Sequence, residues 1–214
     1  KMFGKMVKIL ARGFFDVVTI HDTYNVGLAE VLFLGEKGSG KTSIVDYLIH
    51  GKFIEQTNPT LSPMVYQTLY EELDFRVLDV CCIEHVREVL DHHPLERGKL
   101  PKAIVYVVDA SQERSRMETS INEFKEWMSY LEKLYPYHSF SKIPLLILFN
   151  KIDLNDNFDL EMYQPHYTLE EWKTRSINPK YDAVSAKFGI GVEDNFQWLI
   201  KNLKLTINVR SEER

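Results

Sequence analysis

The sequence predicts one α/β domain whose sheet is doubly wound and mostly parallel, with helices on both faces. Short, continuously apolar runs, typical of strands buried on both sides, alternate with longer segments whose apolar residues recur at helical spacing. The 214 residues suffice for one domain with a full core, and no repeat or Pro/Gly-rich linker divides them. Ligands of such sheets bind at the carboxyl ends of the strands, so residues that follow the apolar runs are the first candidates for a site.

The first half of the domain contains three predicted strands and one helix. Residues 29–34 are an apolar run that enters a glycine-rich turn, and a helix is predicted directly after it over residues 42–50. Residues 64–70 and 74–78 are two further strands, joined by the acidic pair at residues 71–72.

The second half continues the alternation. Residues 103–108 and 144–149 are predicted as buried strands on either side of a long helix over residues 113–135. The inner stripe of that helix is Ile121, Phe124, Met128 and Leu131. Residues 168–171 (Thr-Leu-Glu-Glu) have capping-box spacing and predict a helix start, and residues 181–184 are a last strand. The inner face of the final helix is predicted to be Val192, Phe196, Leu199 and Leu203.

Residues 1–27 form a predicted extension before the domain at residues 28–208, and residues 209–214 form a short tail. Within the extension, apolar residues recur at helical spacing: Phe3, Met6, Leu10, Phe14 and Val17. Basic residues fall on the opposite face: Lys1, Lys5, Lys8 and Arg12. A basic amphipathic helix suits a membrane surface or a partner groove, and it equally suits packing on its own domain with a solvated basic side.

The overall charge excludes some classes of partner. A formal net charge of -5 gives no general attraction to nucleic acid or to an anionic membrane, so any such contact is local. The only cysteines, Cys81 and Cys82, are adjacent and cannot join distant parts of the fold, which fits a reducing compartment. The apolar runs are too short to span a bilayer.

Residues 35–42 carry the strongest motif, Gly-Glu-Lys-Gly-Ser-Gly-Lys-Thr, which is a complete G-x-x-x-x-G-K-[ST] between a strand and a helix. Gly38 and Gly40 allow the backbone to curl so that successive N–H groups point at phosphate oxygens, and the helix that follows adds its N-terminal dipole. Lys41 is expected at the β- and γ-phosphates, and the Thr42 hydroxyl at Mg²⁺. The motif therefore predicts a phosphate-binding P-loop.

Two later segments point to guanine as the base. Asn150, Lys151 and Asp153 follow a buried strand in the pattern N-K-x-D. The Asp153 carboxylate can accept hydrogen bonds from guanine N1–H and the 2-amino group, a donor pair that adenine lacks on that edge. Lys151 can lay its stem along the base, and Asn150 can brace the loop. Residues 185–187 (Ser-Ala-Lys) follow the last strand, where the Ala186 N–H can donate to guanine O6.

Two residues between these motifs are candidates for Mg²⁺ coordination. Thr60 follows a proline in a polar loop, and its hydroxyl can complete the coordination of the ion, although it is equally an ordinary turn residue. Asp79 ends the strand at residues 74–78 and can hold a Mg²⁺-bound water. The predicted metal residues are therefore Thr42, Thr60 and Asp79.

The order of these motifs resembles that of small GTPases. The N-terminal helix, the Pro-Thr pair at residues 59–60, and residues 107–111 (Val-Val-Asp-Ala-Ser) before a long helix make the chain most similar to the ADP-ribosylation-factor-like (Arf/Arl) branch. The resemblance covers nearly the whole chain. It implies a P-loop NTPase fold with a six-stranded sheet, bound GTP or GDP with Mg²⁺, and two switch loops that present different surfaces in the two states.

The sequence departs from the family pattern after Asp79. Val-Gly-Gly-Gln is usual there, whereas this chain has Val80, Cys81, Cys82 and Ile83. The missing glycine is the one whose N–H approaches the γ-phosphate, and the missing glutamine orients the attacking water. Lys37 also replaces the small or acidic residue usual in the P-loop. We therefore expect very slow intrinsic GTP hydrolysis, and we assign no catalytic residue.

These observations leave two functional hypotheses. The first is an Arf-like GTPase that binds effectors according to its nucleotide, and the alternative is a pseudo-GTPase that serves as a nucleotide-stabilised subunit of a larger complex. We expect an intracellular location, in the cytoplasm, at the periphery of a membrane or in a cilium. The residues expected to bind the nucleotide are Gly35, Lys37, Gly38, Ser39, Gly40, Lys41, Thr42, Ser43, Thr60, Asn150, Lys151, Asp153, Ser185, Ala186 and Lys187.

Overall fold

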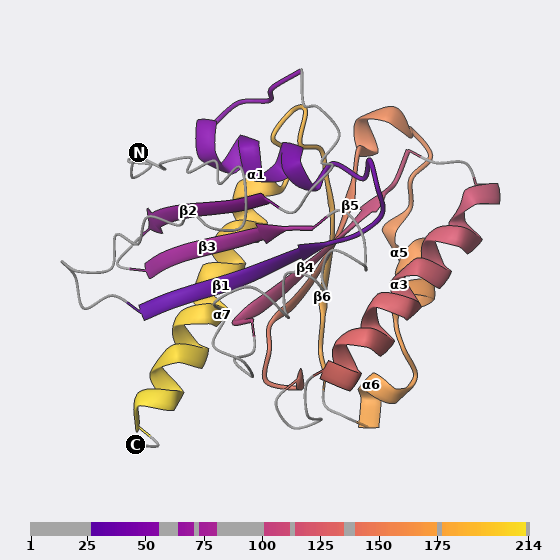
Figure 1. The fold of residues 1–214 in the computed structure, drawn as a ribbon. Coiled ribbons are helices and arrows are strands. Elements are labelled where there is room, and N and C mark those ends of the chain that lie inside the picture. The colour runs from indigo at the N-terminus through magenta and orange to yellow at the C-terminus, as the bar shows by residue number, and fades with distance from the viewer. Residues whose placement is uncertain are drawn as a thin grey trace.

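The computed structural model of the chain describes residues 27–55, 64–70, 73–80, 101–111, 114–134, 140–174 and 177–212. Six strands form one sheet in the order β2-β3-β1-β4-β5-β6 (Figure 1). The strands are β1 (Gly27–Leu34), β2 (Met64–Tyr70), β3 (Leu73–Asp79), β4 (Ala103–Asp109), β5 (Leu145–Asn150) and β6 (Lys180–Val184). The predicted six-stranded sheet is therefore confirmed.

Five of the strands run parallel, and β2 alone is antiparallel to its neighbour. The pairs β1–β3, β1–β4, β4–β5 and β5–β6 are all parallel. β2 pairs with β3 so that Met64 lies opposite Asp79 and Tyr70 opposite Leu73. Only two residues separate β2 from β3, which permits a hairpin, whereas a parallel crossover needs a dozen or more residues. The prediction of a mostly parallel sheet holds.

Helices cover both faces of the sheet. α1 (Lys41–His50) and α7 (Val192–Glu212) pack on one face, and α3 (Arg114–Leu134) packs on the other together with the short α5 (Leu160–Tyr163) and α6 (Glu171–Thr174) (Figure 1). Two 3-10 turns complete the described elements, η1 (Ile152–Leu154) and η2 (Gln164–Tyr167).

Strand β1 contributes side chains to the hydrophobic cores on both faces of the sheet. Ala29, Val31 and Phe33 point to the face of α1 and α7, whereas Leu32 and Leu34 point to the face of α3, and all five are buried. This two-residue period is that of a central strand, and it explains why the run is apolar at every position except Glu30, which is itself buried.

The predicted helix faces agree with the observed packing. The inner residues of the final helix are all buried: Val192, Phe196, Leu199 and Leu203. In α3, Phe124, Met128 and Leu131 are buried, and Ile121 packs against them at the edge of the same core.

The segment between β5 and β6 differs from the prediction. The helix expected after Thr168 is the single turn α6, and the preceding residues form α5 and η2, which the sequence pattern did not predict. Tyr163 and Tyr167 place their rings against Phe149 of β5, at centroid distances of 6.4 and 5.2 Å. These short turns are therefore fixed by aromatic packing on the sheet, because helices of one turn have little stability of their own.

Several predicted features lie outside the described residues: residues 1–26 of the extension, Thr60, Cys81, Cys82 and Ile83. α7 continues to Glu212, so it includes most of the predicted tail. Among the described residues, no helix combines the length and the apolar character needed to cross a membrane.

Candidate functional site

The predicted motifs meet at one edge of the sheet. β1, β4, β5 and β6 run parallel and end at Leu34, Asp109, Asn150 and Val184. The carboxyl ends of parallel strands share an edge, so the segments that follow them lie close together. We call residues 35–42 the phosphate loop and residues 150–155 the base loop.

Glycines give the phosphate loop its curled backbone. Gly35 has φ 134° and Gly40 has φ 92°, both in the range that side chains rarely adopt. A Cβ on Gly35 would lie 2.1 Å from the carbonyl oxygen of Val107 in β4, and one on Gly40 would lie 2.2 Å from Nδ2 of Asn150. The two glycines therefore let the loop pass directly against the neighbouring strand and against the base loop.

Lys41 extends its ammonium into the curl of the phosphate loop. Its Nζ donates to the carbonyl oxygens of Gly35 at 2.7 Å and Glu36 at 2.8 Å, and the residue is only 5% exposed. α1 begins at Lys41, and its N-cap residue Gly40 has no side chain to satisfy the first N–H groups of the helix. The loop thus gathers a buried cation and a helix N-terminus, the two features that bind phosphate.

Thr42 and Asp79 form an oxygen-rich corner beside the phosphate loop. The Thr42 hydroxyl donates to Asp79 Oδ2 at 2.5 Å, and Asp79 is fully buried at the end of β3. Burial raises the pKa of Asp79, an effect that the Thr42 hydrogen bond and the charge of Lys41 oppose. Within the described part of the chain, Asp79 Oδ1 is buried and has no hydrogen-bond partner. The Thr42 hydroxyl and the Asp79 carboxylate are oxygen ligands of the kind that Mg²⁺ prefers. The third predicted ligand, Thr60, lies outside the described residues.

Asn150 joins the phosphate loop to the turn after β6. Its Nδ2 donates to the Ser39 carbonyl at 2.9 Å, and its Oδ1 accepts from the Ala186 N–H at 3.0 Å. The side chain is 1% exposed, so both bonds are shielded from water. Asn150 thus braces the loop as expected, whereas the Ala186 N–H that was expected at guanine O6 is engaged by Asn150.

The side chains of Asp153 and Lys151 are both held by contacts with residues outside the base loop. Asp153 Oδ1 accepts from the Ser185 hydroxyl at 2.6 Å, which ties the carboxylate to the turn after β6. Lys151 has φ 69° and is the only described residue other than glycine with a positive φ. Its Nζ lies 2.6 Å from Asp109 Oδ2. A left-handed lysine is a strained conformation that surrounding contacts must hold, and such residues cluster at functional sites.

The remaining predicted site residues differ in how far they are exposed to solvent. Lys37 and Lys187 are exposed, and the Lys187 ammonium lies 5.3 Å from the centroid of the Phe188 ring. Ser43 is half-buried on α1. Ser39 is buried, and its hydroxyl has no hydrogen-bond partner among the described residues.

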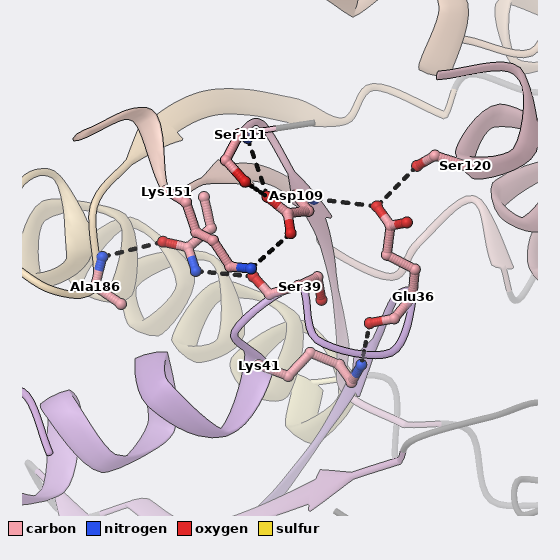
Figure 2. Close-up of polar contacts among 9 residues, drawn as sticks. Glu36, Ser39, Lys41, Asp109, Ser111, Ser120, Lys151 and Ala186 are labelled. Atoms are coloured by element: carbon pink, nitrogen blue, oxygen red, sulfur yellow. Dashed lines mark hydrogen bonds and ion pairs between the residues drawn. The ribbon is translucent and has the colours of Figure 1, made fainter. Parts of the chain in front are cut away.

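Two residues of the site were not predicted as site residues, Glu36 and Asp109. Glu36 Oε1 accepts from the Asp109 N–H at 3.2 Å and from the Ser120 hydroxyl at 3.0 Å (Figure 2). Asp109 Oδ1 accepts from the N–H and the hydroxyl of Ser111 at 3.0 and 2.6 Å. One signal could have identified Asp109, since it is a polar residue that ends a buried strand, as Asp79 and Asn150 are.

A sequence model of the ADP-ribosylation factor family matches residues 22–203, which include all the loops of this site. The chain belongs to the ADP-ribosylation factor family. It is 24% identical over 173 residues to ADP-ribosylation factor-like protein 2 of Dictyostelium discoideum, which covers 81% of this chain and 86% of that protein. It is 28% identical over 173 residues to ADP-ribosylation factor-like protein 8c of Arabidopsis thaliana, with the same coverage of 81% and 86%. This Arf-family chain is thus a GTP-binding small GTPase, as its motifs predicted.

Proposed function

We propose that this Arf-family chain binds GTP and GDP with Mg²⁺, presents nucleotide-dependent surfaces to effectors, and hydrolyses GTP very slowly. The supporting observation is the bridge made by Asn150. It joins the loop that holds Lys41 to the turn that holds Ser185, and Ser185 in turn fixes Asp153. Phosphate recognition and base recognition are thereby parts of one connected site.

Selection of guanine rests on Asp153. Its Oδ1 accepts from Ser185, and within the described part of the chain its second carboxylate oxygen accepts no hydrogen bond. A carboxylate held at one oxygen offers the other, together with its remaining lone pairs, to the paired donors of guanine. Adenine would leave this charge without donors, which is the costly outcome that gives discrimination.

Thr42 and Asp79 are the described residues that would hold Mg²⁺, with Thr60 as a further predicted ligand. The ion would neutralise charge on the β- and γ-phosphates. Lys41 would supply the second positive charge by transferring hydrogen bonds from the carbonyl oxygens of the loop to phosphate oxygens.

Slow hydrolysis is proposed from the residues that follow Asp79. Ile83 takes the position of the family glutamine, and a side chain without donor or acceptor cannot orient a water molecule. Cys82 takes the position of a glycine and restricts the backbone that would approach the γ-phosphate. Among the residues expected to bind nucleotide, Lys37 is the one noted departure from the family pattern, and the P-loop and N-K-x-D motifs are complete, so binding and turnover are expected to separate.

Two measurements test this proposal. The purified protein is denatured and the released nucleotide is identified by chromatography; GTP indicates arrested turnover, GDP a working or spent switch, and an adenine nucleotide contradicts guanine recognition. Single-turnover release of phosphate from preloaded GTP then measures hydrolysis directly. We expect a rate well below that of an Arf protein with its activator, and a comparable rate would refute slow hydrolysis.

The same replacements favour one alternative, a pseudo-GTPase in which the nucleotide is a structural ligand of a larger complex. The two functions differ in whether partner binding depends on the nucleotide. A partner that binds the GTP and GDP forms equally well supports the structural subunit, and one that prefers the GTP form supports the switch. The N-terminal extension is a second proposed contact, with a membrane or with a groove of the partner.

A further inference from the structure

We propose that Asp109 is a positioning residue that fixes Lys151 for the guanine base and locks the base loop to the phosphate loop. The inference rests on the proposed binding of guanine nucleotide at this site. It concerns a residue at the end of β4 that takes part in neither the phosphate motif nor the base motif.

Asp109 contacts both loops with different atoms. Its Oδ2 lies 2.6 Å from the ammonium of Lys151 in the base loop, and its backbone N–H donates to Glu36 Oε1 in the phosphate loop at 3.2 Å. Its Oδ1 accepts two hydrogen bonds from Ser111, which hold the carboxylate in one orientation (Figure 2). One residue therefore connects the two halves of the site.

The segment that begins at Asp109 holds the base loop at several points. The Ala110 N–H donates to the Asn150 carbonyl at 2.8 Å, and the Ala110 carbonyl accepts from Asn155 Nδ2 at 2.8 Å. Along the base loop, Lys151 lies between Asn150 and Asn155, the two residues that make these hydrogen bonds. The end of β4 therefore contacts the first residue, the second residue and the last residue of the base loop.

Lys151 requires such a restraint. Its backbone is left-handed, and its side chain has four rotatable bonds whose ordering is costly in entropy. The Asp109 carboxylate is 9% exposed and the Lys151 side chain 31% exposed, so the pair is partly shielded from water and holds the stem before the base arrives. A preorganised stem does not have to be ordered at the moment of binding.

Asp109→Asn isolates the charge of this residue. The amide keeps an oxygen that can accept from Ser111, but it places a neutral group, or a donor, opposite the Lys151 ammonium. Lys151→Met removes the ammonium and keeps an apolar stem of similar length. The control is Asp194→Asn, which removes an exposed carboxylate from the first turn of α7.

The experiment measures dissociation of a fluorescent GDP from the full chain in the presence of Mg²⁺ and excess unlabelled GDP. We expect Asp109→Asn and Lys151→Met each to accelerate dissociation about tenfold, in proportion to one lost charge-assisted hydrogen bond. The double variant is expected to be no faster than either single variant, because Asp109 acts through Lys151. Asp194→Asn is expected to match the wild type.

Independent effects would overturn the inference. A double variant about a hundredfold faster than the wild type, the product of the two single effects, would mean that Asp109 does not act through Lys151. An unchanged rate in Asp109→Asn would overturn it as well. A wild-type chain that binds no guanine nucleotide would instead contradict the proposed function, and this is seen before any variant is made.

A second variant covers the case in which Asp109→Asn does not fold. Ser111→Ala removes the 2.6 Å hydrogen bond that orients the Asp109 carboxylate. We expect it to accelerate dissociation about threefold when Lys151 is present, the effect of one ordinary hydrogen bond, and to have no effect in the Lys151→Met background. An equal effect in both backgrounds would overturn the inference.

Discussion

Asp153 is the residue that we propose to select the base. One oxygen of its carboxylate is fixed by the Ser185 hydroxyl, and the turn that contains Ser185 is itself held by Asn150 through the Ala186 N–H. The geometry of this carboxylate therefore depends on the turn after β6 as well as on its own loop. A short N-K-x-D turn alone would not hold it.

We expect Asp153→Asn to weaken GDP binding by about 100-fold or more, since two hydrogen bonds to a charged acceptor are each worth roughly 1.5–3 kcal/mol. The same variant should bind xanthosine diphosphate (XDP) more tightly, because the 2-oxo group of xanthine can accept a hydrogen bond from the new amide N–H. Fluorescence titration with both nucleotides measures the change. Asp156→Asn, at an exposed position in the following turn, is the control. Unchanged GDP affinity in Asp153→Asn would contradict the role of this carboxylate.

The backbone of the phosphate loop lies directly against two neighbouring segments. The loop passes so close to β4 and to the base loop that two of its glycines have no room for a side chain. Gly38 also has a positive φ, of 82°, but a Cβ there would have no heavy atom within 4 Å. A side chain at Gly38 would therefore strain the backbone alone, whereas one at Gly35 would strain the backbone and also clash with β4.

We expect Gly35→Ala to destabilise the protein more than Gly38→Ala does. The left-handed backbone costs both variants about 1–3 kcal/mol, and Gly35→Ala also forces the Val107 carbonyl of β4 to move, which costs a further amount of about 1–3 kcal/mol. Urea unfolding of the nucleotide-free proteins measures the difference. Equal free energies of unfolding would show that the loop can move away from β4 without cost.

The buried face of α3 carries a polar chain that leads from the phosphate loop into the core. The Tyr167 hydroxyl donates to Ser120 Oγ at 2.8 Å, and Ser120 donates to Glu36. Burial raises the pKa of Tyr167 to about 12, which the hydrogen bond with Ser120 partly opposes. The neutral phenol is therefore the form that the folded protein stabilises.

Stability should consequently fall as the pH rises from about 10 to about 12. In this window the unfolded chain loses the Tyr167 proton while the folded protein keeps it, so a higher pH favours unfolding. The contribution of this residue is at most about 2–3 kcal/mol. Urea unfolding between pH 9 and 12 should give a shallower loss of stability for Tyr167→Phe than for the wild type. Equal slopes would mean that the phenol ionises without cost in the folded state.

The whole molecule is expected to respond to the nucleotide through mass action. A ligand that binds only the folded state at a concentration of 100 Kd adds about 2.7 kcal/mol to the free energy of unfolding. For a domain of this size each kcal/mol raises Tm by roughly 2–4 °C. GDP with Mg²⁺ should therefore raise Tm by about 5–10 °C, as measured by differential scanning fluorimetry. ADP should give no shift, and GDP with the Asp153→Asn variant should give a shift of at most about 1–2 °C, because GDP is then near the Kd of the variant. An equal shift with ADP would contradict selection of guanine.

Much of the fold could be predicted because it depends on local patterns. The runs in β1, β4 and β5 are buried on both sides, so nearly all of their residues are apolar and the pattern is visible without any partner; the exceptions are Glu30 and the strand-ending Asp109 and Asn150. The one-turn helices between β5 and β6 could not be predicted in the same way. Their stability comes from Tyr163 and Tyr167 against Phe149, and these contacts form only once the strand is in its sheet.

The sequence by itself determined the family, the order of the elements and the residues of the phosphate and base loops, because contiguous motifs carry that chemistry within a few residues. Only the tertiary structure decided which distant groups hold those residues. Glu36, Ser120 and Asp109 are far apart in the chain, yet hydrogen bonds bring them to one point. Parallel strands gather their carboxyl ends at one edge whatever the sequence distance between them, and for this reason the partners of Lys151 and Asn150 follow from topology and not from spacing.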